Sequence, residues 1–174
     1  MRQLVIFFMA LLVFTACQEK APEPQEPEVA EVDPMMEKFH KNVETTKAML
    51  QAFCDKDSTK FFSYVSDDFI WSPPSVGQDS LPIETWKEAM KGFMAAYNDI
   101  EFTNGQYYAG LDEDQKPNGD VRTYGLWKSK MAETGAEQRL KWYSVGFFNE
   151  EGKVVHMAEW YDTADLTREY KGED

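Results

Sequence analysis

Apolar side chains recur at helical spacing in the first part of the chain, and these stripes predict three helices. A stripe that returns every three or four positions predicts a long amphipathic helix over about residues 36–55. It contains Met36, Phe39, His40, Val43, Leu50, Phe53 and Cys54. Asp57-Ser58-Thr59 can cap a short second helix over residues 60–65. A third stripe predicts a helix over residues 84–97 and contains Ile83, Trp86, Met90, Phe93, Met94 and Tyr97.

From residue 100 onward the pattern changes to alternation, with aromatic and β-branched residues at every second position. The alternating runs cover about 100–111, 120–131, 138–148 and 153–162. The breaks between them are rich in turn formers and short enough for hairpins. A shorter run, Asp68-Phe69-Ile70-Trp71-Ser72, stops at two prolines and predicts a short strand or an edge. Helices followed by antiparallel strands indicate an α+β fold, with helices packed on one face of a curved sheet.

The first 17 residues have the pattern of an export signal. One basic residue, Arg2, precedes an unbroken apolar run from Leu4 to Val13. This run is too short for a membrane-spanning helix, which needs roughly 20 apolar residues, and it is typical of a secretory signal. The following Phe14-Thr15-Ala16-Cys17 resembles the lipobox of bacterial lipoproteins, with Phe14 in place of the usual leucine. The resemblance implies cleavage before Cys17 and lipid attachment to its thiol. The alternative is an ordinary secretory signal in which Cys17 has no role.

The segment 18–34 has the composition of a disordered tether. It contains four of the eight prolines in the chain and six acidic residues. Such a segment cannot bury enough apolar surface to fold, and prolines keep it extended at about 3.1 Å per residue. We therefore expect three parts: a lipoprotein signal peptide over 1–17, the tether over 18–34 and a folded domain over 35–174. A lipidated Cys17 would hold this domain on a membrane of the bacterial cell envelope, and we expect the outer membrane.

The charge balance argues against several classes of partner, and the few cysteines and histidines argue against a metal site. Without residues 1–17 the chain has 17 basic and 31 acidic residues, a formal charge of −14. This argues against nucleic acid, whose phosphates need Lys and Arg, and against electrostatic docking on anionic lipids. Cys54 lies on an apolar stripe and is interpreted as a small buried hydrophobic residue. Neither His40 nor His156 has metal-ligand spacing, so no metal or cofactor is predicted.

Three stretches together resemble the NTF2-like superfamily, and in particular its SnoaL-like branch. They are DFIWSPP, IETWKEAMKGFMAAYNDIEF and GKVVHMAEWYDTADL, within a similarity that covers about 37–170. The resemblance implies a cone, in which a strongly curved antiparallel sheet wraps around about three helices and leaves a pocket. The superfamily includes ketosteroid isomerases, dehydratases, epoxide hydrolases and polyketide cyclases alongside domains that only bind. The fold therefore does not name a reaction.

The last strand carries the candidate site, because alternation divides its polar residues between two faces. One face would carry Val154, His156, Ala158, Trp160 and Asp162. The other would carry Val155, Met157, Glu159 and Tyr161. This second set is the more apolar, and we predict that it faces the helices. Glu159 would then be a carboxylate in a hydrophobic surround, with a raised pKa suited to proton transfer. The resemblance also implies an acid or base at this position of the last strand.

Further ligand-binding residues are predicted around Glu159. The resemblance places Trp71 of the first strand at the mouth of the cone. Tyr124 and Trp127 represent the aromatic residues of the central strands, about half of which would point inward. His40 on the first helix could oppose Glu159 across the cone, although a satisfied core histidine is the plainer interpretation. Asp162 has the position of an N-cap for the turn that follows it.

Two functions of different class stay open. The first is a lipid-anchored envelope domain that binds a small, mostly apolar molecule in an aromatic-lined pocket, or a protein partner on its sheet. Superfamily members pair sheet to sheet, so a homodimer through the convex face is one such partner. The second is an isomerase, dehydratase or hydrolase that uses Glu159 as general acid or base. Binding is favoured because the sequence shows no complete catalytic constellation.

The two functions make different structural demands. An enzyme should have a buried Glu159 within about 3 Å of His40 or of a tyrosine hydroxyl. A pocket filled by Met157, Met90, Phe93 and other bulky side chains would exclude both small-molecule functions and leave a role as a scaffold or in binding a partner.

Substitution of Cys17 by alanine tests the predicted anchor. Cys17→Ala should move the protein from the membrane fraction to the soluble fraction, because each buried CH₂ of an acyl chain contributes about 0.8 kcal/mol to membrane binding. Cell fractionation followed by immunoblotting measures the distribution, with Cys54→Ala as the matched control. A Cys17→Ala protein that stays with the membrane would contradict lipidation.

Overall fold

A computed structural model describes residues 33–171 of the chain. Its elements are α1 (Pro34–Cys54), α2 (Ser58–Phe62), β1 (Val65–Ser72), β2 (Leu81–Pro82), α3 (Ile83–Ala96), β3 (Tyr97–Leu111), β4 (Pro117–Met131), β5 (Glu137–Phe148), β6 (Val154–Trp160) and the 3₁₀ helix η1 (Thr163–Leu166). None of the helices in this part of the chain is long and apolar enough to cross a membrane. Cys17 and most of the predicted tether lie outside the described residues.

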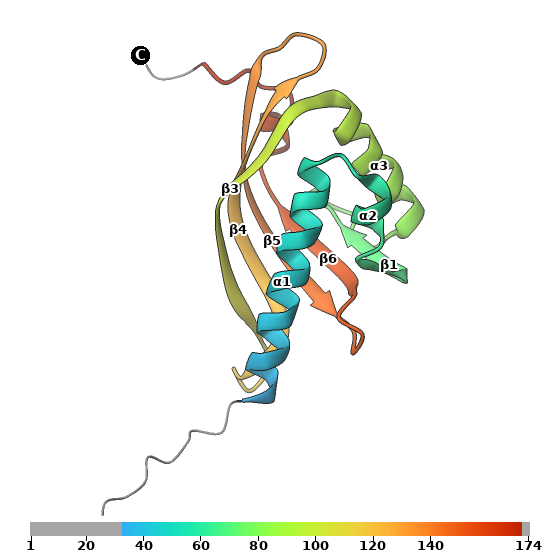
Figure 1. The fold of residues 1–174 in the computed structure, drawn as a ribbon, viewed down its shortest axis with the longest axis vertical. Helices are drawn as coiled ribbons and strands as arrows, with labels where there is room; N and C mark the ends of the chain where they lie inside the picture. Colours follow the sequence, from blue (N-terminus) through green and yellow to red (C-terminus); the bar gives the residue numbers. More distant parts are fainter. Residues whose placement is uncertain (1–32, 172–174) are drawn as a thin grey trace, which may run out of the picture. The chain divides into compact units, whose positions relative to one another are not determined.

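The six strands form one bent sheet in the order β2-β1-β6-β5-β4-β3. The four long strands β3 to β6 pair antiparallel through hairpins, as predicted. The prediction of a purely antiparallel sheet is wrong at one place, because β1 pairs with β6 in parallel. A parallel pair requires a long crossover connection, and here α3 and the whole meander supply it. The helices lie on one side of the curved sheet (Figure 1).

Helix α1 begins two residues earlier than predicted because Asp33 caps it. The Asp33 side chain accepts a hydrogen bond of 2.8 Å from the Met35 N–H, and Pro34 fits the first helical position. The buried face of α1 also differs from the predicted stripe, since it includes Asn42 and Thr46 and leaves His40 exposed. The Asn42 amide donates to the Gly119 carbonyl at 2.8 Å, and such hydrogen bonds allow polar residues to be buried.

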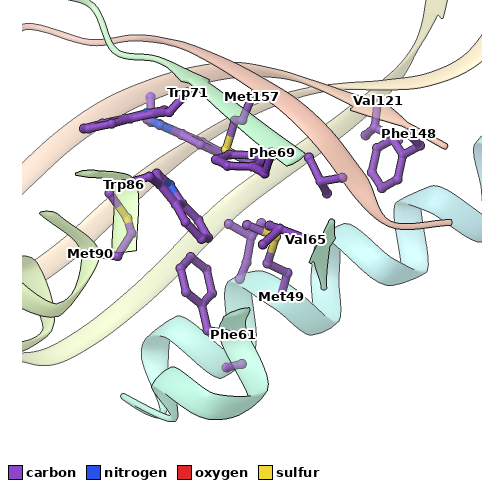
Figure 2. Packing of buried hydrophobic residues seen from close by; sticks show 14 of the residues in the cluster. Met49, Phe61, Val65, Phe69, Trp71, Trp86, Met90, Val121, Phe148 and Met157 are labelled. Carbon is purple, nitrogen blue, oxygen red and sulfur yellow. The ribbon is translucent and has the colours of Figure 1, made fainter. Parts of the chain in front are cut away.

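A cluster of aromatic side chains holds α2 and α3 against β1. Trp86 of α3 is fully buried, and it stacks on Phe61 of α2 at 5.1 Å between ring centroids. Phe69 of β1 contacts the same indole at 4.7 Å. Figure 2 shows Trp86 surrounded by these two rings and by Met90. Aromatic pairs of this kind contribute about 0.5–1.5 kcal/mol each beyond the area that they bury, so this end of the sheet is firmly packed.

On the concave face of the central strands, a glycine makes room for an aromatic ring. A Cβ at Gly125 of β4 would lie 2.1 Å from Cζ of Phe102 of β3, so only glycine fits beneath that ring. Phe102 in turn contacts Trp127 at 4.7 Å and Trp142 at 5.7 Å between ring centroids. The aromatic side chains of β3, β4 and β5 therefore form one connected wall beside the candidate site.

Candidate functional site

A β-bulge in β6 decides which side chains of this strand face the helices. The pairing with β5 shifts from Phe147 opposite His156 to Phe148 opposite Val154, so Val155 is the extra residue. Val154 is therefore buried on the concave side, whereas simple alternation predicted it on the face of His156. Beyond the bulge the alternation resumes, and Glu159 lies on the concave side as predicted.

Glu159 is held by two tryptophans from different strands. Its side chain is buried, with 8% exposure for the whole residue. The indole Nε1–H of Trp71 on β1 donates to Oε2 at 2.5 Å, and that of Trp142 on β5 donates to Oε1 at 2.9 Å. Hydrogen bonds to an ionised acceptor are shorter and stronger than neutral ones. Three strands, β1, β5 and β6, thus meet at one carboxyl group.

Burial raises the pKa of Glu159 above its ordinary value, and the two indole donors only partly oppose this shift. The folded protein therefore binds this proton more tightly than the unfolded chain does. The contribution of Glu159 to stability is fully present below the unfolded pKa and is lost as the pH rises through the raised pKa. When protonated, the carboxyl group can still accept both indole hydrogen bonds and direct its own O–H into the space beside it.

That space is a cavity of about 110 Å³ between the helices and the concave face of the sheet. Its wall is largely apolar and is formed by residues such as Leu50, Phe53, Met90, Phe93, Leu140 and Met157. Polar side chains also line it: Thr46, Tyr97, Thr123, Ser129, Gln138, Ser144, Glu159, Tyr161 and Asp165. The bulky side chains named as a possible plug therefore surround the cavity without filling it. This volume is smaller than that of an engineered cavity of about 150 Å³ in another protein, which binds benzene.

Four of the predicted pocket residues line the cavity, namely Trp127, Met157, Glu159 and Tyr161. Burial and the charge of Glu159 raise the pKa of Tyr161, which keeps its hydroxyl protonated. Trp71 is not part of the lining and acts on the site through its hydrogen bond to Glu159.

Two predicted positions are wrong. Tyr124 is 37% exposed on the convex face, where it stacks on Tyr143 at 4.4 Å between ring centroids. Tyr124 and Trp127 are three residues apart, and β4 pairs with β5 there without a bulge, so the two side chains face opposite sides. His40 is exposed beside Phe39 at the edge of the buried face of α1 and does not oppose Glu159.

The convex face carries a serine–histidine pair that the sequence pattern did not reveal. Ser72 Oγ lies 2.9 Å from His156 Nε2, and His156 stacks on Phe147 at 4.9 Å between ring centroids. The Ser72 hydroxyl donates its single proton to the Asp79 carbonyl, so His156 is the donor in the pair. Burial lowers the pKa of His156. In this arrangement the histidine does not accept the Ser72 proton, so the pair is not set up as an activated nucleophile.

The remaining polar features of the described residues add no metal site, and Asp165, a further acid of the cavity wall, is paired with Arg168 at 2.6 Å. Within residues 33–171 no group of three or more His, Cys, Asp or Glu side chains is arranged to hold a metal ion. Asp162 caps η1 as predicted, accepting from the Ala164 N–H at 2.9 Å. Tyr97 donates its hydroxyl to the Leu166 carbonyl at 2.5 Å, which fastens η1 over one end of the cavity.

Solved structures share this fold at low sequence identity. A proposed isomerase of Bacillus subtilis superimposes with a TM-score of 0.62 and 16% identity, over 74% of this chain and 91% of that one. An NTF2-like protein of Burkholderia xenovorans gives 0.56 and 16%, over 75% and 95%. A proposed polyketide cyclase of Silicibacter sp. gives 0.59 and 14%, over 77% and 98%.

These likenesses show the fold alone. Residues 33–171 have the NTF2-like cone fold, which the resemblance in the sequence predicted. The sequence matches no protein-family model, and no curated protein aligns with it.

Replacement of Trp71 tests the role of the two indoles. Trp71→Phe should lower the free energy of unfolding by about 2 kcal/mol, because it leaves a buried carboxyl oxygen without its donor, a loss of about 1–3 kcal/mol. Urea unfolding monitored by circular dichroism measures the change. Trp160→Phe is the matched control, since Trp160 is 51% exposed, and should cost less than about 0.5 kcal/mol. Equal losses in both variants would contradict the assigned role of Trp71.

Proposed function

We propose that this domain binds a small, mostly apolar molecule inside the cone and places a polar group of that molecule against Glu159. The observation that carries the proposal is a single buried carboxyl group, fixed by Trp71 and Trp142, at the wall of a largely apolar cavity. Ligand sites of proteins have this composition, with a few placed polar groups that orient the ligand. The cavity volume of about 110 Å³ suits a ligand with one ring or a short chain.

Binding without transformation is favoured by the partners of Glu159. General acid–base catalysis needs a second group that exchanges or stabilises charge within hydrogen-bond reach. Among the described residues, Glu159 is bonded by two indole N–H groups, and an indole only donates and does not exchange its proton at neutral pH. The tryptophans therefore fix the position of the acid without relaying a proton.

The second candidate is an enzyme of the isomerase, dehydratase or hydrolase type, in which Glu159 moves a proton on the bound molecule. The raised pKa of Glu159 favours this candidate, because the acid then titrates closer to neutral pH. Proteins with the same fold are proposed to be an isomerase and a polyketide cyclase, which is consistent with proton transfer in such a cavity.

The lipid anchor is part of the same proposal. It is supported by the sequence of residues 1–34, in which a lipobox-like cysteine precedes an acidic, proline-rich segment. Because α1 begins at Pro34, the domain would follow directly on the tether, at the bacterial cell envelope and on the outer membrane.

The homodimer through the convex face stays a prediction. It is supported by four large side chains exposed on that side of the sheet: Ile70, Tyr108, Tyr124 and Trp160.

Two substitutions on opposite faces of β6 test the binding site. Glu159→Gln should weaken binding of phenol, a ring with one hydroxyl, by about fivefold, since one hydrogen bond contributes about 1 kcal/mol and the new amide N–H₂ faces an indole donor. His156→Ala, on the convex side, should leave the affinity unchanged. Isothermal titration calorimetry on the purified protein measures both.

The reverse pattern, with His156→Ala the weaker binder, would show that the ligand lies on the other face. Mass spectrometry of small molecules that copurify with the wild type, compared with Glu159→Gln, would identify the natural ligand.

A further inference from the structure

We propose that Gln138 is a second ligand-recognition residue, which selects molecules that carry a carboxamide-type group on an apolar body. This inference rests on the proposed binding function and makes the ligand class specific. A carboxamide-type group here means a neutral group that donates and accepts at neighbouring atoms, as in amides, lactams and undissociated carboxylic acids.

Gln138 is a buried polar side chain of the cavity wall, and its amide has no hydrogen-bond partner among the described residues. The residue is 4% exposed, and it lines the same cavity as Glu159. Neither Nε2 nor Oε1 has a hydrogen-bond partner among the described residues, although both atoms are buried. A buried polar group without a partner costs about 1–3 kcal/mol, and a glutamine amide has donors and acceptors to satisfy. A ligand with the complementary pair of groups would remove that cost.

The other buried polar side chains do not have this property. Glu159 accepts a hydrogen bond at each oxygen, and Asn42 donates to the Gly119 carbonyl. The Ser66 hydroxyl is also buried without a partner among the described residues, but Ser66 does not line the cavity. Gln138 thus combines an unsatisfied amide with a position on the ligand cavity.

Neighbouring strands fix Gln138 at the start of β5. It lies opposite Ser129 of β4, a second polar residue of the cavity wall. On the other side, the Glu137 carbonyl accepts a hydrogen bond of 2.8 Å from the Tyr170 N–H. The Arg139 guanidinium lies 3.9 Å from the centroid of the Tyr170 ring. The backbone on both sides of Gln138 is therefore held in place.

Glu159 and Gln138 lie far apart along the direction of β5. Glu159 pairs with Ser144, and Gln138 is six residues earlier on the same face of the strand. At about 3.3 Å per residue this is up to about 20 Å between backbones, which the two inward side chains and the bend of the sheet shorten. Gln138 is therefore a recognition point separate from Glu159, and it reads a different group of the ligand.

Charge favours a neutral group at Gln138. The chain has a formal charge of −13, and the cavity wall at Gln138 contains Leu140 and Ile100. On the cavity side of Gln138 an ionised carboxylate would lose its hydration, because the nearby cations Lys128, Lys130 and Arg139 line a separate, more polar hollow that Gln138 also borders. An amide or a lactam keeps both hydrogen bonds to Gln138 and enters without a charge.

The test uses two probes of matched shape on the full protein, benzamide and isopropylbenzene, which differ in whether the side group on the ring forms hydrogen bonds. Gln138→Leu should raise the ratio of the benzamide Kd to the isopropylbenzene Kd at least tenfold, because only benzamide loses partners. The same substitution should raise the melting temperature of the ligand-free protein, since an unsatisfied amide is removed. Gln138→Met serves as a second variant of similar length if Gln138→Leu does not fold. Gln51→Leu, at an exposed glutamine of α1, is the matched control and should leave the ratio unchanged.

The outcomes separate this inference from the function on which it rests. A Kd ratio that is the same in wild type and in both Gln138 variants would overturn the role of Gln138, while binding of the two probes would still support the cavity as a ligand site. Failure of the wild type to bind either probe would overturn the proposed function and, with it, the assignment of Gln138.

Discussion

The hydrogen bonds from Trp71 and Trp142 to Glu159 are the interaction on which the site depends. A carboxylate in an apolar interior loses its hydration, at an effective cost of several kcal/mol, unless fixed donors replace the water. Here one donor comes from β1 and the other from β5, and the acid itself comes from β6. The same group therefore ties the parallel strand β1 to the antiparallel meander and fixes where polar chemistry can occur in the cone.

This arrangement explains why the site is suited to holding a ligand. An indole fixes the carboxyl group in one orientation, and the shape of the cavity limits what can reach it. The raised pKa makes Glu159 more readily protonated than an ordinary glutamate, so it can donate a hydrogen bond to a ligand oxygen as well as accept one. Tyr161 remains a neutral hydroxyl on the same cavity wall, so it can donate a hydrogen bond to a ligand but does not act as a base.

Periodicity in the sequence was sufficient for the two long helices, the four long strands and the inward position of Glu159, because these depend on local patterns; the second helix, predicted over 60–65, is Ser58–Phe62, and β2 was not predicted. It was insufficient wherever pairing between distant residues decides the outcome. The bulge at Val155 turns Val154 toward the cavity. Tyr124 lies on the face of β4 that points away from the cavity.

Other features of the site depend on tertiary contacts that no local pattern contains. The edge of the buried face on α1 is set by its contacts with β4, which is why His40 is exposed. The second tryptophan and the unsatisfied amide of Gln138 become evident only when β5 is aligned with its neighbours.

A direct titration of Glu159 tests the central claim. The chemical shift of its ¹³Cδ, followed by NMR against pH and assigned with Glu159→Gln, should give a midpoint clearly above the ordinary glutamate pKa of about 4.3. A midpoint at or below that value would mean that hydration or the indole donors outweigh the effect of burial, and would contradict a readily protonated acid in an apolar site.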